Sequence, residues 1–353
     1  MAIKNVVVAG ATGNLGPPIL AALTSSGSFN IAIFSRPKAQ SGATSPSATT
    51  TPVLVPVPAN TNNDHGHTNN ANGKPSSPVP QANIVEVDYD SILDLTTQLA
   101  ATSVDAVLSL LPHTAGAKQT NLIHASVAAG VKRFIPSEFG ADLDNPINRG
   151  APTYKGKVAV QELLKGLAAE NKISYTIMYN GAFLDWGLTH SFPVDVRLRT
   201  ATLHDGGDRM YSTTTQPTIG KALVAILQRE EESKNRVIRI AEATLTIRDL
   251  LSLVQEQIGT EDWSITETDL DVGINKATSL LKSGVFNRES MMPFIHRAQW
   301  GAKAGGYFRN TDNVWLGIDE LDADGVRGVI ARVIREWREA ELSASKQRLG
   351  WPA

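Results

Sequence analysis

Two hydrophobic patterns alternate along the first half of the chain: short continuous apolar runs, and longer segments with apolar residues at helical spacing. Val6 to Ala9 form a continuous run, which is typical of a parallel strand buried on both faces. Ile19, Leu20 and Leu23 then recur at helical spacing, and Gly27 is placed to end that helix. The same patterns predict strands at 31–34, 84–88, 104–108, 132–135 and 174–178, and helices at 92–99, 115–129 and 157–170.

This alternation predicts an α/β fold with a doubly wound parallel sheet of the Rossmann, NAD(P)-binding kind, over residues 1–180. Beyond Gly181 the pattern loosens, although helices are predicted at 218–229, 247–258 and 325–342. Thr246 is the expected N-cap of the second, with Asp249 three residues later. We expect residues 181–353 to form a smaller, mixed C-terminal substrate subdomain, partly contributing to the sheet, with a cleft between the two parts.

One segment interrupts the pattern. Residues 40–83 are rich in Ser, Thr, Asn, Gly and Pro, which predicts a disordered insertion after the second strand. His65 and His67 within it are the kind of pair that could bind a metal, but two histidines in a polar loop are more often simply solvated.

Composition excludes several classes of function. The chain has no cysteine, which removes disulfides, thiolate metal sites and a cysteine nucleophile. A net charge of −2 gives no reason to expect a nucleic acid or an anionic membrane as partner. The N-terminal apolar run is far shorter than a membrane span, so we expect a cytoplasmic protein. The oligomeric state stays open.

The segment GATGNLG, Gly10 to Gly16, is here called the glycine turn. A dinucleotide site needs one glycine for the bend after the strand, one where the backbone approaches the pyrophosphate and one where the helix packs on the strand; Gly10, Gly13 and Gly16 match these roles in order. We expect the amides of Asn14 and Leu15 and the Thr12 hydroxyl to face the phosphates. The spacing differs from G-x-G-x-x-G and favours the short-chain dehydrogenase lineage.

Two prolines follow the glycine turn where a helix is expected. If the helix starts near Asn14, Pro17 and Pro18 fall in the first turn, whose amides have no intrahelical partner. The phosphate-binding amides are therefore predicted upstream of the prolines, from Thr12 to Leu15.

The end of the second predicted strand indicates the type of dinucleotide. NAD sites place a carboxylate there, whereas NADP sites need a cation for the 2′-phosphate. Arg36 and Lys38 stand at this point with no acid nearby, which favours NADPH. The alternative is that both are ordinary exposed basic residues.

The usual catalytic pair of short-chain dehydrogenases, a tyrosine with a lysine four residues later, is missing. Tyr154, for example, is followed at that position by Val158. Three other segments carry a resemblance instead: RFIPSEFGADLD at 133–144, YKGKVAVQELL at 154–164 and ISYTIMYNGAF at 173–183. With the glycine turn, they closely resemble the NmrA-like group. Its enzymatic branch contains the isoflavone, pinoresinol-lariciresinol and phenylcoumaran benzylic ether reductases, and the chain is most similar to fungal-type isoflavone-reductase-like members.

The resemblance implies an atypical, NADPH-dependent short-chain dehydrogenase whose catalytic group is a lysine after the PSEFG segment. Lys157 matches this position best, and Lys155 is the alternative. A lysine beside the nicotinamide in a water-poor cleft can pass a proton to the substrate as hydride arrives. Other positions that the resemblance places along the cofactor are Gln119, Ser137, Phe139, Asn180 and Phe183.

Several of these positions have a second interpretation. Phe139 and Phe183 could be simple core residues. Trp186 and His190 are expected at the substrate cleft, or His190 is structural. Asp88 would meet the adenine edge or cap a turn.

The leading hypothesis is therefore an NADPH-dependent oxidoreductase that transfers hydride to a small aromatic substrate, in secondary metabolism as the resemblance implies. The competing hypothesis is a regulator, because NmrA itself resembles these enzymes yet binds dinucleotide without turnover. A non-redox reaction with a vestigial cofactor is a third.

Overall fold

The computed structural model describes residues 2–37 and 82–348. Most of the predicted insertion at 40–83, the His65 and His67 pair within it, and Lys38 lie outside the described residues.

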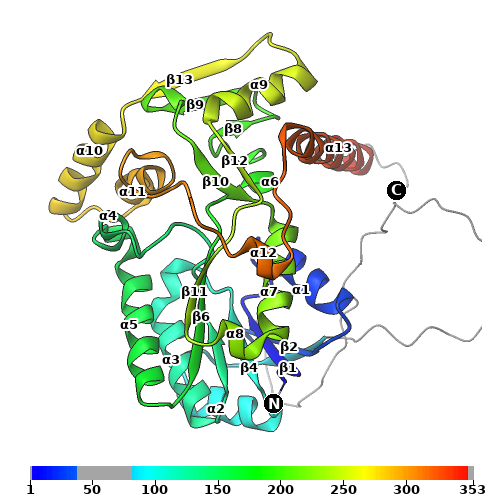
Figure 1. Cartoon of the computed structure of the whole chain (residues 1–353), viewed down its shortest axis with the longest axis vertical. Coiled ribbons are helices and arrows are strands. Elements are labelled where there is room, and N and C mark those ends of the chain that lie inside the picture. The colour runs from blue at the N-terminus through cyan, green and yellow to red at the C-terminus, as the bar shows by residue number, and fades with distance from the viewer. Residues whose placement is uncertain (1, 38–81, 349–353) are drawn as a thin grey trace, which may run out of the picture.

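A parallel sheet forms the lower part of the molecule in the view of Figure 1. Its strands are β1 Asn5–Ala9, β2 Asn30–Ser35, β3 Asn83–Glu86, β4 Ala106–Ser109, β5 Arg133–Ile135, β6 Ser174–Tyr179 and β11 Arg236–Arg239. They lie in the order β11-β6-β5-β4-β1-β2-β3, and every neighbouring pair is parallel. This confirms the predicted doubly wound fold, in which the order reverses beside β1 and places a ligand crevice at the carboxyl ends of β1 and β4.

Helices cover both faces of this sheet. They are α1 Gly16–Ser25, α2 Ile92–Ala101, α3 Gly116–Ala128, α5 Lys155–Ala169 and α7 Gln216–Gln228. The short helices α8 Glu230–Ser233 and α12 Asn313–Leu316 lie beside α7, whereas α4 Pro146–Arg149 and α6 Leu184–Gly187 contact the upper part of the molecule. Helices α1 and α7 pack against each other on one face, and α2, α3 and α5 lie on the other.

The continuous apolar run of β1 explains this two-sided packing. Val6 and Val8 join the core under α1 and α7, whereas Val7 and Ala9 join the core under α2, α3 and α5. Because successive side chains of a strand point to opposite faces, a strand covered on both sides needs an apolar residue at every position.

The upper part of the molecule is built from the second half of the chain (Figure 1). One small sheet has the order β12-β10-β7 and another the order β13-β9-β8. Their strands are β7 Ala182–Phe183, β8 Val194–Asp195, β9 Thr200–His204, β10 Tyr211–Thr214, β12 Ala243–Leu245 and β13 Ser264–Thr268, and the helices are α9 Ile247–Ile258, α10 Leu270–Lys282, α11 Arg288–Trp300 and α13 Ala323–Arg348.

Local sequence signals place several helix ends correctly. Thr246 caps α9 in a reciprocal arrangement with Asp249, as predicted. The predicted start of the first helix was wrong by two residues, since α1 begins at Gly16. Pro17 and Pro18 occupy its first turn, where the missing amides cost no intrahelical hydrogen bond.

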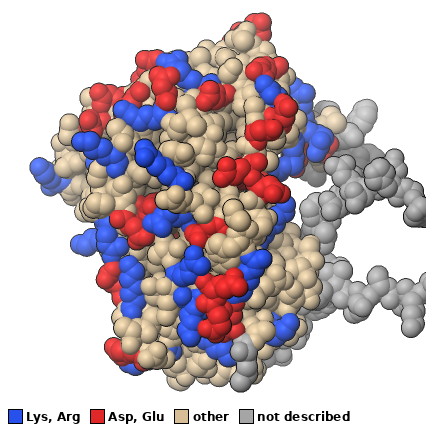
Figure 2. All heavy atoms as spheres, viewed as in Figure 1, with Lys and Arg blue, Asp and Glu red and all other residues tan. Residues whose placement is uncertain are grey.

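The surface carries both signs of charge. Basic and acidic side chains are interspersed on the face shown in Figure 2, as a net charge of −2 over 353 residues leads one to expect. Among the residues at 2–37 and 82–348, none of the helices combines the length and apolar character needed to cross a bilayer.

Candidate active site

The glycine turn connects β1 to α1. At two of its glycines, neighbouring backbone atoms leave no room for a side chain. Gly10 has a φ of +84°, and a Cβ there would lie 2.7 Å from the carbonyl oxygen of Leu110. At Gly16 a Cβ would lie 1.7 Å from the carbonyl oxygen of Ala11. At Gly13 the nearest atom would be 3.5 Å away, an ordinary contact. The space over Gly13 is therefore left open by the surrounding chain.

The same turn presents backbone donors to that space. The amides of Gly13 and Gly16 donate within the turn, to the carbonyl oxygens of Gly10 at 3.2 Å and Gly13 at 3.0 Å. Within the described part of the chain, the amides of Thr12, Asn14 and Leu15 donate to no other residue. Three free donors at the positive end of α1 form an anion-binding arrangement. Because Gly13 has no side chain, an anion has room to approach these amides.

Two buried polar atoms without partners lie at the carboxyl edge of the sheet. Ser109 ends β4 and Asn180 follows β6, and neither Ser109 Oγ nor Asn180 Oδ1 has a hydrogen-bond partner among the described residues. The Asn180 amide nitrogen donates to the carbonyl oxygen of Gly181 at 3.0 Å. Unpaired buried acceptors and hydroxyls are costly, so their position at the ligand-binding edge of an α/β sheet fits a bound dinucleotide.

Arg36 follows β2 directly and is exposed. It forms no ion pair with any residue that the structure describes. Its charge acts on Tyr89, whose hydroxyl donates to the carbonyl oxygen of Phe34 at 2.9 Å: burial raises the pKa of Tyr89, and Arg36 opposes this. The Arg36 guanidinium, without an ion-pair partner among the described residues, therefore stands at the end of the second strand, where the sequence predicts a cation. Asp88 accepts a hydrogen bond from the amide of Asp90 at 2.9 Å, so it caps a turn.

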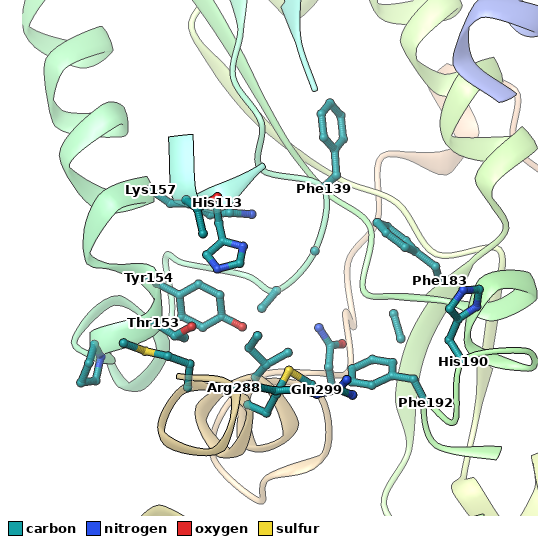
Figure 3. A pocket seen from close by; sticks show the side chains of 18 of the residues that line it. His113, Phe139, Thr153, Tyr154, Lys157, Phe183, His190, Phe192, Arg288 and Gln299 are labelled. Carbon is teal, nitrogen blue, oxygen red and sulfur yellow. The ribbon is translucent and has the colours of Figure 1, made fainter. Parts of the chain in front are cut away.

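A cavity of about 810 Å³ lies between the carboxyl edge of the sheet and α11 (Figure 3). Its walls are mostly apolar and aromatic, and its volume suits a multi-ring organic molecule together with the nicotinamide end of a cofactor. The lining includes Phe139, Phe183, Trp186, His190, Phe192, Phe286, Met291, Met292 and Ile295, and the polar residues His113, Thr114, Thr153, Tyr154, Lys157, Asn287, Arg288 and Gln299.

The two candidate lysines differ in position. Lys157 lines the cavity and donates to the carbonyl oxygen of Glu138, whereas Lys155 is exposed and is not among the cavity residues. Burial lowers the pKa of Lys157, and the nearby Glu138 carboxylate opposes this shift. Burial in turn raises the pKa of Glu138. The geometry favours Lys157 over Lys155 as the residue able to transfer a proton in the cavity.

A side chain of α3 supports the PSEFG turn, residues 136–140, through a hydrogen bond. The side-chain oxygen of Gln119 accepts a hydrogen bond from the Ser137 amide at 2.9 Å, so Gln119 is a support for this turn. Phe139 has a φ of +37°, a left-handed conformation that is unusual for a bulky residue, and its ring lines the cavity (Figure 3). The sequence alone left Phe139 and Phe183 as either site or core residues, and the structure supports both interpretations: each borders the cavity, while Phe139 belongs to the core under α1 and α7 and Phe183 packs against it.

Trp186 and His190 also line the cavity, as expected for a substrate cleft. Their rings stack at 4.3 Å, and His190 Nδ1 lies 2.8 Å from the carbonyl oxygen of Trp186. His190 thus also fixes the shape of the wall.

Sequence reasoning missed Tyr154, because the search was for a lysine four residues after a tyrosine. Tyr154 directly precedes α5 and stands three residues before Lys157, so the two side chains lie on the same side of the helix start. Tyr154 is 6% exposed, its hydroxyl has no partner among the described residues, and Figure 3 shows that hydroxyl directed into the cavity. Burial raises the pKa of Tyr154, so the hydroxyl keeps its proton as a hydrogen-bond donor.

Gln299 was also missed, because α11 was not predicted. Pro293 lies inside this helix and conceals its periodicity. A signal was present nevertheless, since Asn287 and Ser290 form a reciprocal cap at its start.

Two histidines pack among the aromatic rings that contact Phe192. Their protonation should make the free energy of unfolding fall at acidic pH. His204 stacks on Trp300 at 4.7 Å and lies 4.6 Å from the ring of His296. Burial lowers the pKa of His204 from 6.5 to about 3, with the neighbouring His296 adding to the effect, and burial lowers the pKa of His296 to about 4, assisted by Arg288. Both rings stay neutral in the folded protein while the unfolded chain binds protons.

The stability that these histidines contribute is therefore complete above about pH 6.5 and is lost as the pH falls toward 4. We expect the Tm to drop in this interval, with His204 accounting for a loss on the order of 3 kcal/mol. Thermal unfolding of His204→Gln at a series of pH values should show a shallower decline than the parent protein. An equal decline in both would contradict the assignment to His204, and the exposed His113→Gln serves as the control.

The sequence is similar to those of known oxidoreductases and reductases. The sequence profile of the NmrA-like family matches residues 2–263. Oxidoreductase aprR of Aspergillus flavus is 29% identical over 286 residues, covering 80% of this chain and 83% of that protein. Phenylcoumaran benzylic ether reductase PT1 of Pinus taeda is 27% identical over 184 residues, covering 50% of this chain and 58% of that protein.

Among solved structures, the binary complex of leucoanthocyanidin reductase with NADPH from Vitis vinifera has a TM-score of 0.66 at 18% identity. The match covers 93% of this chain and all of that chain. At this identity the likeness supports the fold, including the arrangement of the upper part over the sheet.

Proposed function

The chain belongs to the NmrA-like family, and from this premise we propose that it is an NADPH-dependent oxidoreductase of the isoflavone reductase-like kind. It transfers hydride to a small aromatic substrate, in secondary metabolism. The names of its relatives support this proposal, since they are an oxidoreductase and a reductase, and the structural neighbour was solved with NADPH.

The cofactor would be held by groups that have no partner within the described chain. The free amides of Thr12, Asn14 and Leu15 suit the pyrophosphate, and the Gly13 position leaves room for it. The Arg36 guanidinium, after β2, suits the 2′-phosphate. The orphaned Ser109 and Asn180 side chains stand at β4 and after β6, on the other side of β1, so they suit the nicotinamide half of the cofactor. Lys38, outside the described residues, stays a predicted second cation.

NADPH supplies a hydride when bound; the chain supplies the proton and the positioning. The Lys157 ammonium, held by the carbonyl oxygen of Glu138, would donate a proton to the substrate oxygen on which negative charge develops. Tyr154 would donate a hydrogen bond to the same oxygen and orient it. Phe139 and Phe183 would exclude water from the reacting face.

One observation carries this proposal: the cavity that contains Lys157 and the Tyr154 hydroxyl opens at the carboxyl edge of the same sheet whose β1 ends in the glycine turn. An anion site and an acid–base pair on one edge of the sheet are the two requirements of a dinucleotide-dependent reduction.

The decisive experiment measures NADPH oxidation with a panel of aromatic carbonyl, enone and benzylic ether compounds. We expect turnover of at least one class. Tight NADPH binding without turnover of any compound would instead support the regulator hypothesis, in which the chain senses the dinucleotide. Turnover without NADPH consumption would support a non-redox reaction.

Arg36 should determine the preference for NADPH over NADH. Replacing it, as Arg36→Ala, removes a charge-assisted hydrogen-bond fork to the 2′-phosphate and should weaken NADPH binding by about 10- to 100-fold while leaving NADH binding unchanged. Isothermal titration with both dinucleotides measures this. An equal loss for both would point to a general charge effect, for which the exposed Arg309→Ala is the matched control.

A further inference from the structure

One of the polar side chains in the cavity wall that the proposed chemistry does not use, Gln299, is buried without a partner among the described residues. Gln299 lies on α11, and Figure 3 shows its amide directed into the cavity from that helix, whereas Lys157 comes from α5 and Tyr154 from the turn before it. The residue is 4% exposed. Its amide has no hydrogen-bond partner among the described residues, and Oε1 is fully buried without one. A buried amide with neither end paired is rare in folded proteins.

Apolar residues of α11 adjoin Gln299 in the cavity wall, and Arg288 of the same helix also lines the cavity. Ile295 and Met292 of the same helix line the cavity beside it, and Phe192 lies in the adjoining wall. An apolar side chain of the same size would pack there without the cost of burying an unpaired amide. The amide is therefore a group whose partner is brought by the ligand.

We propose that Gln299 is a specificity-determining residue that selects substrates with a free hydroxyl group other than the oxygen that Lys157 and Tyr154 would contact. This rests on the proposed function, since it assumes that the cavity binds the aromatic substrate. A hydroxyl group is the partner that suits the amide in either orientation, because it accepts from Nε2 and donates to Oε1. A methyl ether can only accept, and a hydrogen atom does neither. Sites built around such a buried polar group reject analogues that lack its partner more strongly than they reject changes in apolar size.

The test measures ligand binding, which does not depend on turnover. The probes are chalcone, its monohydroxy isomers and the methyl ether of each, titrated into the NADP⁺-loaded protein by isothermal calorimetry. We expect one hydroxy isomer to bind at least about tenfold more tightly than chalcone and its own methyl ether. In Gln299→Leu this preference should fall to about onefold while the affinity for chalcone stays the same or increases. Met292→Leu, in the same wall, should keep the preference.

Thermal unfolding separates this role from a structural one. Gln299→Leu and Gln299→Met remove an unpaired buried amide and should leave the Tm unchanged or raise it, whereas an amide that holds the fold together would lower it. A hydroxyl preference that persists in both variants would overturn the proposal, as would a parent protein that binds no hydroxylated probe more tightly than chalcone. If the preference is present but NADPH is never consumed, Gln299 retains its role and the oxidoreductase assignment fails.

Discussion

Replacement of Lys157 by methionine is expected to lower kcat by about 10²- to 10⁴-fold, the usual contribution of a positioned general acid. Methionine keeps much of the length and apolar body of the side chain but removes the ammonium group that donates to the carbonyl oxygen of Glu138. NADPH affinity should change little, because the pyrophosphate and 2′-phosphate contacts lie elsewhere. Steady-state kinetics on the best substrate of the panel, with NADPH titration alongside, measure both quantities.

Lys155 provides the matched control for this experiment. It stands two residues earlier in α5 but is exposed and does not line the cavity, so Lys155→Met should keep its kcat. The pH profile adds an independent readout. A proton donor must be protonated, so kcat should fall as the pH rises through the pKa of Lys157, which burial places below its ordinary value of 10.5. Full activity in Lys157→Met, or a loss in Lys155→Met, would contradict the assignment of Lys157.

The sheet could be predicted because its strands carry their own signal. Val6 to Ala9 are apolar at every position, and only a strand covered on both faces requires this. The upper part is different, because its strands are short and pair with distant segments: β7 has two residues and lies beside β10, about 30 residues later. Nothing within such a strand specifies its partner, so these sheets could not be inferred from local patterns.

The same distinction applies to the site. The glycine turn and Arg36 are read from one βαβ unit, within which the order of residues fixes their places. Gln299 and Tyr154 come from α11 and from the start of α5, 145 positions apart in the chain, and only folding brings both to one cavity. The resemblance that indicated Lys157 carried no information about Gln299, because it was based on segments that end at Phe183.

Replacement of Gly13 by valine should abolish NADPH binding while leaving the protein folded. A Cβ at this position meets only the carbonyl oxygen of Gly10 at 3.5 Å, and the backbone is not in the left-handed region, so a side chain is accommodated by the chain itself. It would, however, fill the space over the free amides of Thr12 and Asn14. We expect a loss of affinity of at least about 100-fold, since close backbone approach supplies the pyrophosphate contacts.

Gly16→Ala tests the close packing of the same turn, whereas Gly13→Val tests its open space. A Cβ at Gly16 would lie 1.7 Å from the carbonyl oxygen of Ala11, and backbone atoms cannot yield as a flexible side chain can. This single methyl group should destabilise the protein by about 3 kcal/mol or more, because the start of α1 must move away from Ala11 in the glycine turn. Urea unfolding of both variants, each with an NADPH titration, separates the two roles. A stable Gly13→Val that still binds NADPH normally would contradict pyrophosphate binding at the glycine turn. An unchanged unfolding midpoint in Gly16→Ala would contradict the close approach of Gly16 to Ala11.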